Sequence, residues 1–167
     1  MRFYIASPFF NEEELANVQI LEGELEEAGH RFFSPRLGGS SKPFAEEKDP
    51  ERRLELAAAI FKDNYEEIIM ADIVLAVVDN RDPGTMWEHG YAFAKSKLLV
   101  TTTFKDFGLN LMIGCATDCH CRSAETRKKV YEYLETTFHV QGYIPPQEIE
   151  AVREVLKKMS DPLGDMF

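Results

Sequence analysis

Three carboxylates follow a run of branched apolar residues in the middle of the chain. The run, residues 73–78, is typical of a strand that is buried on both faces, and Asp79 and Asp82 lie in the polar turn after it. Thr85 is expected to cap the next helix and to place Glu88 in its first turn. Ligands of open α/β sheets bind at the carboxyl ends of the strands. The three acids therefore form either a ligand site or a solvated loop beside an ordinary capping box.

Carboxylates at a strand end suit chemistry at a glycosidic carbon. One carboxylate acts as the nucleophile, while a second acid or a hydrogen-bond network helps the leaving group to depart. Other chemistries lack their motifs, because the chain has no G-x-x-x-x-G-K-[ST] phosphate loop, no G-x-G-x-x-G after the first strand and no G-x-S-x-G elbow. The aromatic residues of Y-I-A-S-P-F-F, at the end of the first strand, either stack on a planar base or pack in the core.

The histidines and cysteines do not form a usual metal-binding motif. His89 follows Glu88 but points about 100° away around the helix, which favours a surface or packing role over catalysis. Cys115, Cys119 and Cys121 form C-x-x-x-C-H-C, a spacing that is unusual for zinc. Adjacent residues on a strand also point to opposite faces of the sheet. We therefore expect buried, reduced thiols.

Alternating strands and helices are predicted to position these groups. Asn11 is expected to cap the first helix and Gly29 to end it. Repeated βα units predict one doubly wound, flavodoxin-like domain over residues 1–167, with a mostly parallel sheet of about five strands flanked by helices. Strands are predicted at 2–6, 31–34, 73–78 and 98–103, with a fifth in the cysteine region. Helices are predicted at 12–28, 50–70, 85–97, 110–114, 125–136 and 146–159.

The segment from residue 35 to residue 50 has the weakest pattern in the chain. It contains Gly38-Gly39-Ser40-Ser41 and several prolines. Connections of this length in compact domains are more often functional or disordered than idle. The segment is therefore either a flap over a site or a long connection.

Composition restricts the class of protein and its partners. The chain has 167 residues, of which 44% are hydrophobic and 29% charged, as in ordinary globular proteins. A net charge of −10 argues against nucleic acid as a partner, because DNA- and RNA-binding surfaces are usually basic. The N-terminus lacks the features of a signal peptide, and no apolar run reaches membrane-spanning length. A cytoplasmic location without membrane contact is expected.

Four spaced motifs resemble the nucleoside 2-deoxyribosyltransferase family. The block D-P-G-T-M-W-E-H-G-Y-A is similar to the family segment G-x-x-x-E-x-G-Y-A. The resemblance implies that Glu88 is the nucleophile and that Asp82, six residues earlier, is the active-site aspartate. It also implies that Tyr4 hydrogen-bonds the nucleophile. Gly84 is the first glycine of the block and falls among the expected substrate-binding residues.

Two further motifs imply how the substrate is held. Phe9 and Phe10 match the stretch of the family that stacks on the base. Asn110-Leu111-Met112 matches an N-L-M segment that the family inserts from a neighbouring subunit, so that Asn110 binds a deoxyribose hydroxyl and Met112 lines the site. The resemblance therefore implies a homo-oligomer, 2′-deoxynucleosides and free nucleobases as substrates, and no cofactor or metal.

The chain departs from the family pattern at two positions. Many members have an aspartate eight residues before the A-D that opens the third strand, and here that position is Asn64, preceded by Asp63. Either Asn64 hydrogen-bonds the base, or a small backbone shift brings Asp63 to it. Both residues cannot serve equally, because neighbours on a helix point in different directions. Some relatives end in a tyrosine that approaches a site, whereas this chain ends in Phe167, which can pack there but has no hydroxyl.

The resemblance implies a retaining double displacement. The Glu88 carboxylate attacks C1′ of a 2′-deoxynucleoside, the base leaves, and a second base attacks C1′ and restores Glu88. One alternative is a nucleoside or nucleotide N-glycoside hydrolase with water as the acceptor. Another is a nucleoside sensor on the same scaffold, which binds without turnover. The residues Pro8-Phe9-Phe10 stand where monophosphate-cleaving relatives have a glycine- and serine-rich loop, which favours an unphosphorylated substrate.

Overall fold

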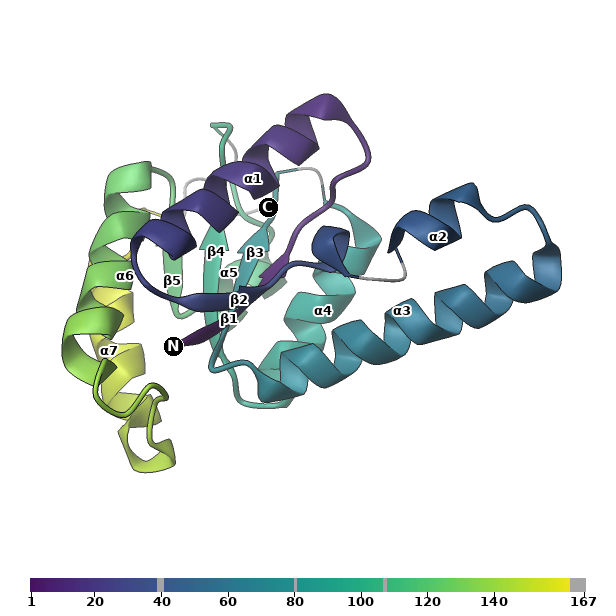
Figure 1. The fold of residues 1–167 in the computed structure, drawn as a ribbon. Coiled ribbons are helices and arrows are strands. Elements are labelled where there is room, and N and C mark those ends of the chain that lie inside the picture. Colours follow the sequence, from purple (N-terminus) through teal and green to yellow (C-terminus); the bar gives the residue numbers. More distant parts are fainter. Residues whose placement is uncertain (39–40, 80, 107, 163–167) are drawn as a thin grey trace.

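A five-stranded sheet forms the centre of the molecule (Figure 1). The structure is a computed structural model that describes residues 1–38, 41–79, 81–106 and 108–162, and within these ranges five strands run parallel in the order β2-β1-β3-β4-β5. This is the strand order of flavodoxin-like doubly wound domains, so the predicted fold class is confirmed. The strands are β1 (Arg2–Ala6), β2 (Arg31–Phe33), β3 (Ile73–Val77), β4 (Leu98–Thr102) and β5 (Cys119–Cys121).

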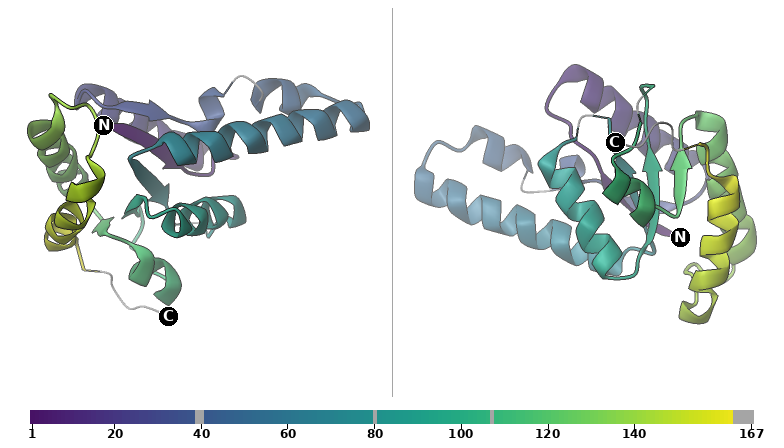
Figure 2. Two further views of the ribbon diagram at one scale, coloured as in Figure 1. Left: turned by 90° about the horizontal axis from the view of Figure 1, so that it is seen from below. Right: turned by 180° about the vertical axis from the view of Figure 1, so that it is seen from behind.

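Helices cover both faces of the sheet (Figure 2). One apolar core lies under α1 and α6, with α7 against β5, and the other lies under α3, α4 and α5. Because both faces are covered, the central strand β3 is apolar along its whole length, and β4 beside it is buried throughout. The helices are α1 (Glu12–Glu27), α2 (Ser41–Glu46), α3 (Pro50–Met70), α4 (Pro83–Ala94), α5 (Leu111–Ala116), α6 (Ala124–Phe138) and α7 (Ile149–Met159), with 3-10 turns η1 (Pro35–Leu37) and η2 (Pro146–Glu148).

Alternation along β1 sends one aromatic side chain to each face of the sheet. Phe3 joins the core under α1 and α6, whereas Tyr4 joins the core under α3 and α4. Tyr4 is fully buried, and its ring lies 5.8 Å from the ring of Phe33. Since β1 pairs with strands on both sides, Tyr4 is held near the middle of the sheet, facing α4.

The start of α4 differs from the sequence prediction. The helix begins at Pro83, and Asp82 is its N-cap, with the Asp82 carboxylate accepting a hydrogen bond of 2.7 Å from the backbone N–H of Thr85. Proline is well suited to the first helical position, and aspartate caps as well as threonine or better. The predicted capping box between Thr85 and Glu88 is therefore wrong, and Glu88 lies in the second turn.

The weakly patterned segment contains more regular structure than was predicted. It includes the turn η1 and the short helix α2, which packs along the N-terminal half of α3 where that helix extends beyond the sheet (Figures 1 and 2). The Ser41 hydroxyl donates to the Pro35 carbonyl at 2.7 Å, and the Arg53 guanidinium lies 4.3 Å from the centre of the Phe44 ring. These contacts join η1, α2 and α3.

The C-terminal third follows the prediction with local differences. The cysteine region supplies β5, and Cys119 and Cys121 are buried free thiols as expected, but Cys115 is exposed on α5. The helix predicted from residue 146 begins with the 3-10 turn η2. No described helix is both long enough and apolar enough to cross a membrane.

Candidate active site

A partly buried carboxylate, Glu88, lies where β1, α3 and α4 meet. The Tyr4 hydroxyl donates a hydrogen bond of 2.5 Å to Glu88 Oε1, and the Asn64 amide donates to the same oxygen at 3.4 Å. Oε2 of Glu88 has no hydrogen-bond partner among the described residues. One oxygen of the carboxylate is thus fixed by donors from two other elements, while the other is available to a ligand.

Burial changes the acidity of this pair. The pKa of Glu88 is raised to about 7, mainly by burial and also by the negative charge of Asp82, while the hydrogen bonds from Tyr4 and Asn64 oppose the rise. Burial, together with the neighbouring Glu88 charge, also raises the pKa of Tyr4. The shared proton therefore stays on the tyrosine, and Glu88 is an acceptor whose ionised form is reached near neutral pH.

The helix start fixes the second carboxylate close to the first. Asp82 caps α4, where the partial positive charge of the helix N-terminus favours an anion. A Cβ atom at Gly84 would lie 3.0 Å from Asp82 Oδ2, so a side chain at that position would press on the capping carboxylate. Glycine thus leaves Asp82 in place and keeps the approach to Glu88 open.

A cavity of about 750 Å³ opens beside Glu88. Its walls combine a few polar groups with several aromatic rings, an arrangement common in small-molecule sites. The Phe9 and Phe10 rings lie 5.2 Å apart after β1, and Phe44 comes from α2. The lining residues are Ser7, Pro8, Phe9, Phe10, Pro35, Ser41, Phe44, Ala45, Arg53, Ile60, Asn64, Asp82, Gly84, Thr85 and Glu88.

A second hollow of about 280 Å³ borders the same carboxylate. Asn64, Gly84 and Glu88 belong to its lining as well as to that of the larger cavity, and Phe61 and Trp87 supply its aromatic walls. Glu88 therefore borders two hollows, so a ligand could contact it from either of them.

The orientation of α3 distinguishes Asn64 from Asp63, the two residues that were predicted as alternative contacts to the base. Asn64 lines both hollows and bonds Glu88, whereas Asp63 is exposed and lines neither. The difference of one residue turns a helical side chain by about 100°. Asn64 is accordingly placed to contact a ligand, and Asp63 faces solvent.

Two predicted substrate contacts, Asn110 and Met112, are not assembled at Glu88 within one copy of the chain. Asn110 caps α5 by accepting a hydrogen bond of 2.9 Å from the Met112 N–H, and both side chains are exposed, Met112 by 74%. Neither residue lines the cavity beside Glu88. Phe167 lies outside the described residues.

Two neighbouring polar residues have structural positions. The Asp79 carboxylate accepts hydrogen bonds of 2.9 Å from the backbone N–H groups of Phe104 and Lys105, so it ties the end of β3 to the loop after β4. His89 is 1% exposed, and burial lowers its pKa to about 4. It is buried on the inner side of α4, which agrees with packing, one of the two roles that the sequence predicted. In the part of the chain that the structure describes, no group of three or more His, Cys, Asp or Glu side chains is arranged so that it could hold a metal ion.

Several lining residues escaped the sequence analysis. Arg53 and Ile60 precede Asn64 on α3 by eleven and four residues, spacings that bring all three to one side of a helix. That spacing was the available signal, once Asn64 was a candidate. Phe44 could not be found in this way, because α2 was not predicted.

Two comparisons with known proteins identify the same family. Residues 3–143 match the family described as nucleoside 2-deoxyribosyltransferase. The solved structure of a 2-deoxyribosyltransferase from Bacillus psychrosaccharolyticus is 32% identical, with a TM-score of 0.67 over 77% of this chain and 90% of that chain. No curated protein sequence matches the chain.

Two more distant structures were also found. A CMP N-glycosidase from Clostridium botulinum is 19% identical, with a TM-score of 0.48 over 82% of this chain and 98% of its own. A conserved protein from Enterococcus faecalis is 16% identical, with a TM-score of 0.45 over 93% of this chain and 87% of its own.

Proposed function

The chain belongs to the nucleoside 2-deoxyribosyltransferase family, and we propose that it transfers 2-deoxyribose between nucleobases through a covalent intermediate on Glu88. The observation that carries the proposal is the Glu88 carboxylate, which is held through Oε1 by Tyr4 and Asn64 and lines an aromatic-walled cavity. A nucleophile fixed in this way has little conformational freedom left to lose when the transition state forms.

In the first step, Glu88 Oε2 forms a bond to C1′ of a 2′-deoxynucleoside. The bond between C1′ and the base nitrogen breaks, its electron pair leaves with the base, and the base takes a proton from water. Positive charge that builds on the sugar is stabilised by the nearby Asp82 carboxylate. The bond from Tyr4 directs Oε1 away from the sugar, so that Oε2 is the attacking atom.

In the second step, a ring nitrogen of the incoming base attacks C1′ and the ester bond to Glu88 breaks. The ester electron pair returns to the carboxylate, and the base releases its N–H proton to water. Two inversions at C1′ give net retention of configuration. Phe9 and Phe10 stack on whichever base occupies the cavity, which allows one site to serve both steps.

The exposed N-terminus of α5 supports a homo-oligomer in which each copy completes a neighbour's site. Asn110 and Met112 lie outside the cavity of their own chain but are exposed and available to another copy. Large apolar side chains on α3, α4 and α5 are exposed as well, which is unusual for a monomer surface and typical of a subunit interface. These side chains are Leu54, Phe61, Trp87, Leu111 and Met112.

One incubation separates transfer from the other activities. With 2′-deoxyinosine and adenine, a transferase forms 2′-deoxyadenosine together with hypoxanthine. Hypoxanthine alone, without a new nucleoside, would identify a hydrolase. Bound deoxyinosine without any product would identify a sensor and would contradict the proposal.

A further inference from the structure

Asn64 lies between the Glu88 carboxylate and both hollows that border it. Its side-chain nitrogen donates to Glu88 Oε1 at 3.4 Å, and the residue lines the larger cavity as well as the smaller hollow. An ionised carboxylate only accepts hydrogen bonds, so the nitrogen of the amide, and not its oxygen, must face Glu88. The second N–H of this nitrogen has no partner among the described residues and is available to a ligand.

A base attached to C1′ lies beside Asn64 whichever hollow it enters. In the proposed reaction C1′ bonds to Glu88, and Asn64 belongs to the wall of both hollows next to that carboxylate. The ring nitrogens and exocyclic oxygens of nucleobases accept hydrogen bonds, and the available N–H of Asn64 is a donor. Asn64 is therefore placed to hold the nucleophile and the departing base at the same time.

The neutral amide of Asn64 can bind a base but cannot protonate it, because an amide does not titrate in the neutral range. Among the described lining residues, Asp82 is the carboxylate besides Glu88, and its place at the N-terminus of α4 favours the ionised form. The lining hydroxyls belong to serine and threonine, which do not titrate either. Arg53 keeps its proton and lies eleven residues, or about 16 Å, along α3 from Asn64.

We propose that Asn64 is a specificity-determining residue, which holds the departing base by a hydrogen bond without proton transfer and thereby favours nucleosides whose bases are acidic. When the bond from C1′ to the base nitrogen breaks, the base keeps the electron pair and a negative charge until water protonates it. The N–H of Asn64 stabilises this charge without cancelling it, so the stability of the base as an anion sets the barrier. Electron-poor bases such as halogenated purines are the favoured class. The inference rests on the proposed function for the position of C1′.

Two nucleosides that differ by one small atom test the preference. 2′-Deoxyadenosine and its 2-fluoro derivative share the ring shape and the amino group, but fluorine withdraws electrons and makes the free base more acidic. With hypoxanthine as the acceptor, kcat/KM for base release reports the first step. It should favour the fluorinated nucleoside by at least about tenfold. A ratio near one would mean that a side chain protonates the departing base, and it would overturn the inference.

Asn64→Asp supplies an acid at the same place. Its carboxyl has nearly the shape of the amide and would lie beside Glu88, where two carboxyl groups hold one proton between them. The ratio between the two nucleosides should fall below about threefold, because a transferred proton cancels the charge on either base. Both proteins meet the same fluorine, so its size cannot change the ratio. An unchanged ratio would show that this side chain does not act on the departing base and would contradict the inference.

Asp63→Asn provides a matched control. Asp63 is the exposed neighbour of Asn64 and lines neither hollow, so both the rates and the ratio should stay as they are. A ratio that changed would identify Asp63 as the proton donor and overturn the inference. Asn64→Ala removes the donor, so it should lower kcat/KM for both nucleosides about tenfold and keep the preference for the fluorinated one. Unchanged rates in this variant would also contradict the role of Asn64.

Base release is measured whatever the acceptor is, which keeps the two proposals distinguishable. A protein that released the base only to water would contradict the proposed transfer, but its ratio would still test Asn64. Transfer with a ratio near one would contradict the role of Asn64 alone. No release from either nucleoside would refute both proposals.

Discussion

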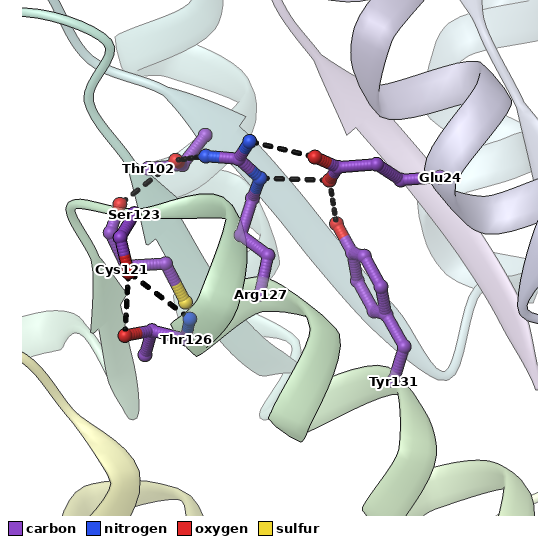
Figure 3. A network of polar contacts seen from close by, with 7 residues as sticks. All are labelled: Glu24, Thr102, Cys121, Ser123, Thr126, Arg127 and Tyr131. Atoms are coloured by element: carbon purple, nitrogen blue, oxygen red, sulfur yellow. Dashed lines mark hydrogen bonds and ion pairs between the residues drawn. The ribbon is translucent and has the colours of Figure 1, made fainter.

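Two glutamates on opposite faces of the sheet each accept a hydrogen bond from a tyrosine, but their surroundings differ. On the face covered by α1 and α6, Glu24 accepts two hydrogen bonds of 2.7 Å from Arg127 and one of 3.5 Å from the Tyr131 hydroxyl (Figure 3). On the other face, Tyr4 and Asn64 hold Glu88, and the charge of Asp82 raises its pKa.

The difference shows what makes a buried carboxylate structural or reactive. Arg127 is 4% exposed, and it also donates to the Thr102 hydroxyl at 3.2 Å, so the Glu24 charge is compensated and joins α1, α6 and β4. Glu88 has neutral donors and a second acid instead of a cation. Its charge is tolerated rather than neutralised, which is the condition expected of a nucleophile rather than of a structural ion pair.

Separate substitutions of Glu88 and Glu24 should distinguish the reactive from the structural carboxylate, and Glu88→Ala should have the largest effect on activity. Glu88→Ala is expected to lower the rate of transfer at least about a thousandfold, because it removes the carboxylate that forms the intermediate. The thermal midpoint should stay within a few degrees of the original. Steady-state transfer between deoxyinosine and adenine provides the measurement, and near-normal transfer by this variant would refute the assignment.

Glu24→Gln should have the opposite result. It leaves the buried Arg127 without a counterion, at an expected cost of about 2–4 kcal/mol in the free energy of unfolding. The rate per folded molecule should not change, since Glu24 does not line the cavity beside Glu88. Urea unfolding monitored by circular dichroism measures the loss. A variant as stable as the original would show that the ion pair is not what holds the two helices.

The two tyrosines extend the comparison. A hydrogen bond to a charged group contributes about 1.5–3 kcal/mol, so Tyr4→Phe should reduce kcat/KM roughly ten- to a hundredfold. The kcat/KM of the original protein should rise with pH and level off above about 7, as Glu88 ionises. Because the Tyr4 bond lowers the pKa of Glu88, its removal should move this midpoint to higher pH.

Tyr131→Phe is the matched control for that experiment. Its hydroxyl makes a long bond to Glu24, so the variant should lose less than about 1 kcal/mol of stability and keep the pH profile unchanged. A pH midpoint that moved in both variants would mean that the effect of Tyr4→Phe is not local to Glu88.

Asp82→Asn should move the pH midpoint in the direction opposite to Tyr4→Phe. Asparagine still caps a helix, so α4 should keep its stability within about 0.5 kcal/mol. The Asp82 charge raises the pKa of Glu88, so the pH midpoint of kcat/KM should fall, by less than about one unit. Asp79→Asn should not move it, because Asp79 bonds the loop after β4. A midpoint that rose in Asp82→Asn would exclude this account of the site's electrostatics.

The sequence was most informative where periodicity and branched side chains decide the structure. The buried strands β1, β3 and β4 and the long helices followed from such patterns, and with them the parallel sheet. The structure brings Tyr4, Asp82 and Glu88 together, although their roles remain predictions. Motif order alone had suggested this arrangement, since Tyr4 is 84 residues from Glu88.

The sequence was least informative where a single residue or a few weak contacts determine the local structure. Asp82 and Thr85 are both good caps, and only the placement of Pro83 at the first helical position distinguishes them. Asp63 and Asn64 differ only in the rotation of α3. The six residues of α2 are too few for a helical pattern, so Phe44 and its contact with Arg53 were missed. Asn110 and Met112 do not line the cavity beside Glu88, so their predicted roles depend on the proposed second copy of the chain.

The central claim is tested most directly by the mass of the protein after brief exposure to a 2′-deoxynucleoside without an acceptor base. A covalent intermediate adds one deoxyribosyl group, and digestion should locate it on the peptide that carries Glu88. The adduct should disappear when adenine is added, with formation of 2′-deoxyadenosine, and should be absent in Glu88→Ala. An adduct on another peptide, or rapid transfer by Glu88→Ala, would contradict the account.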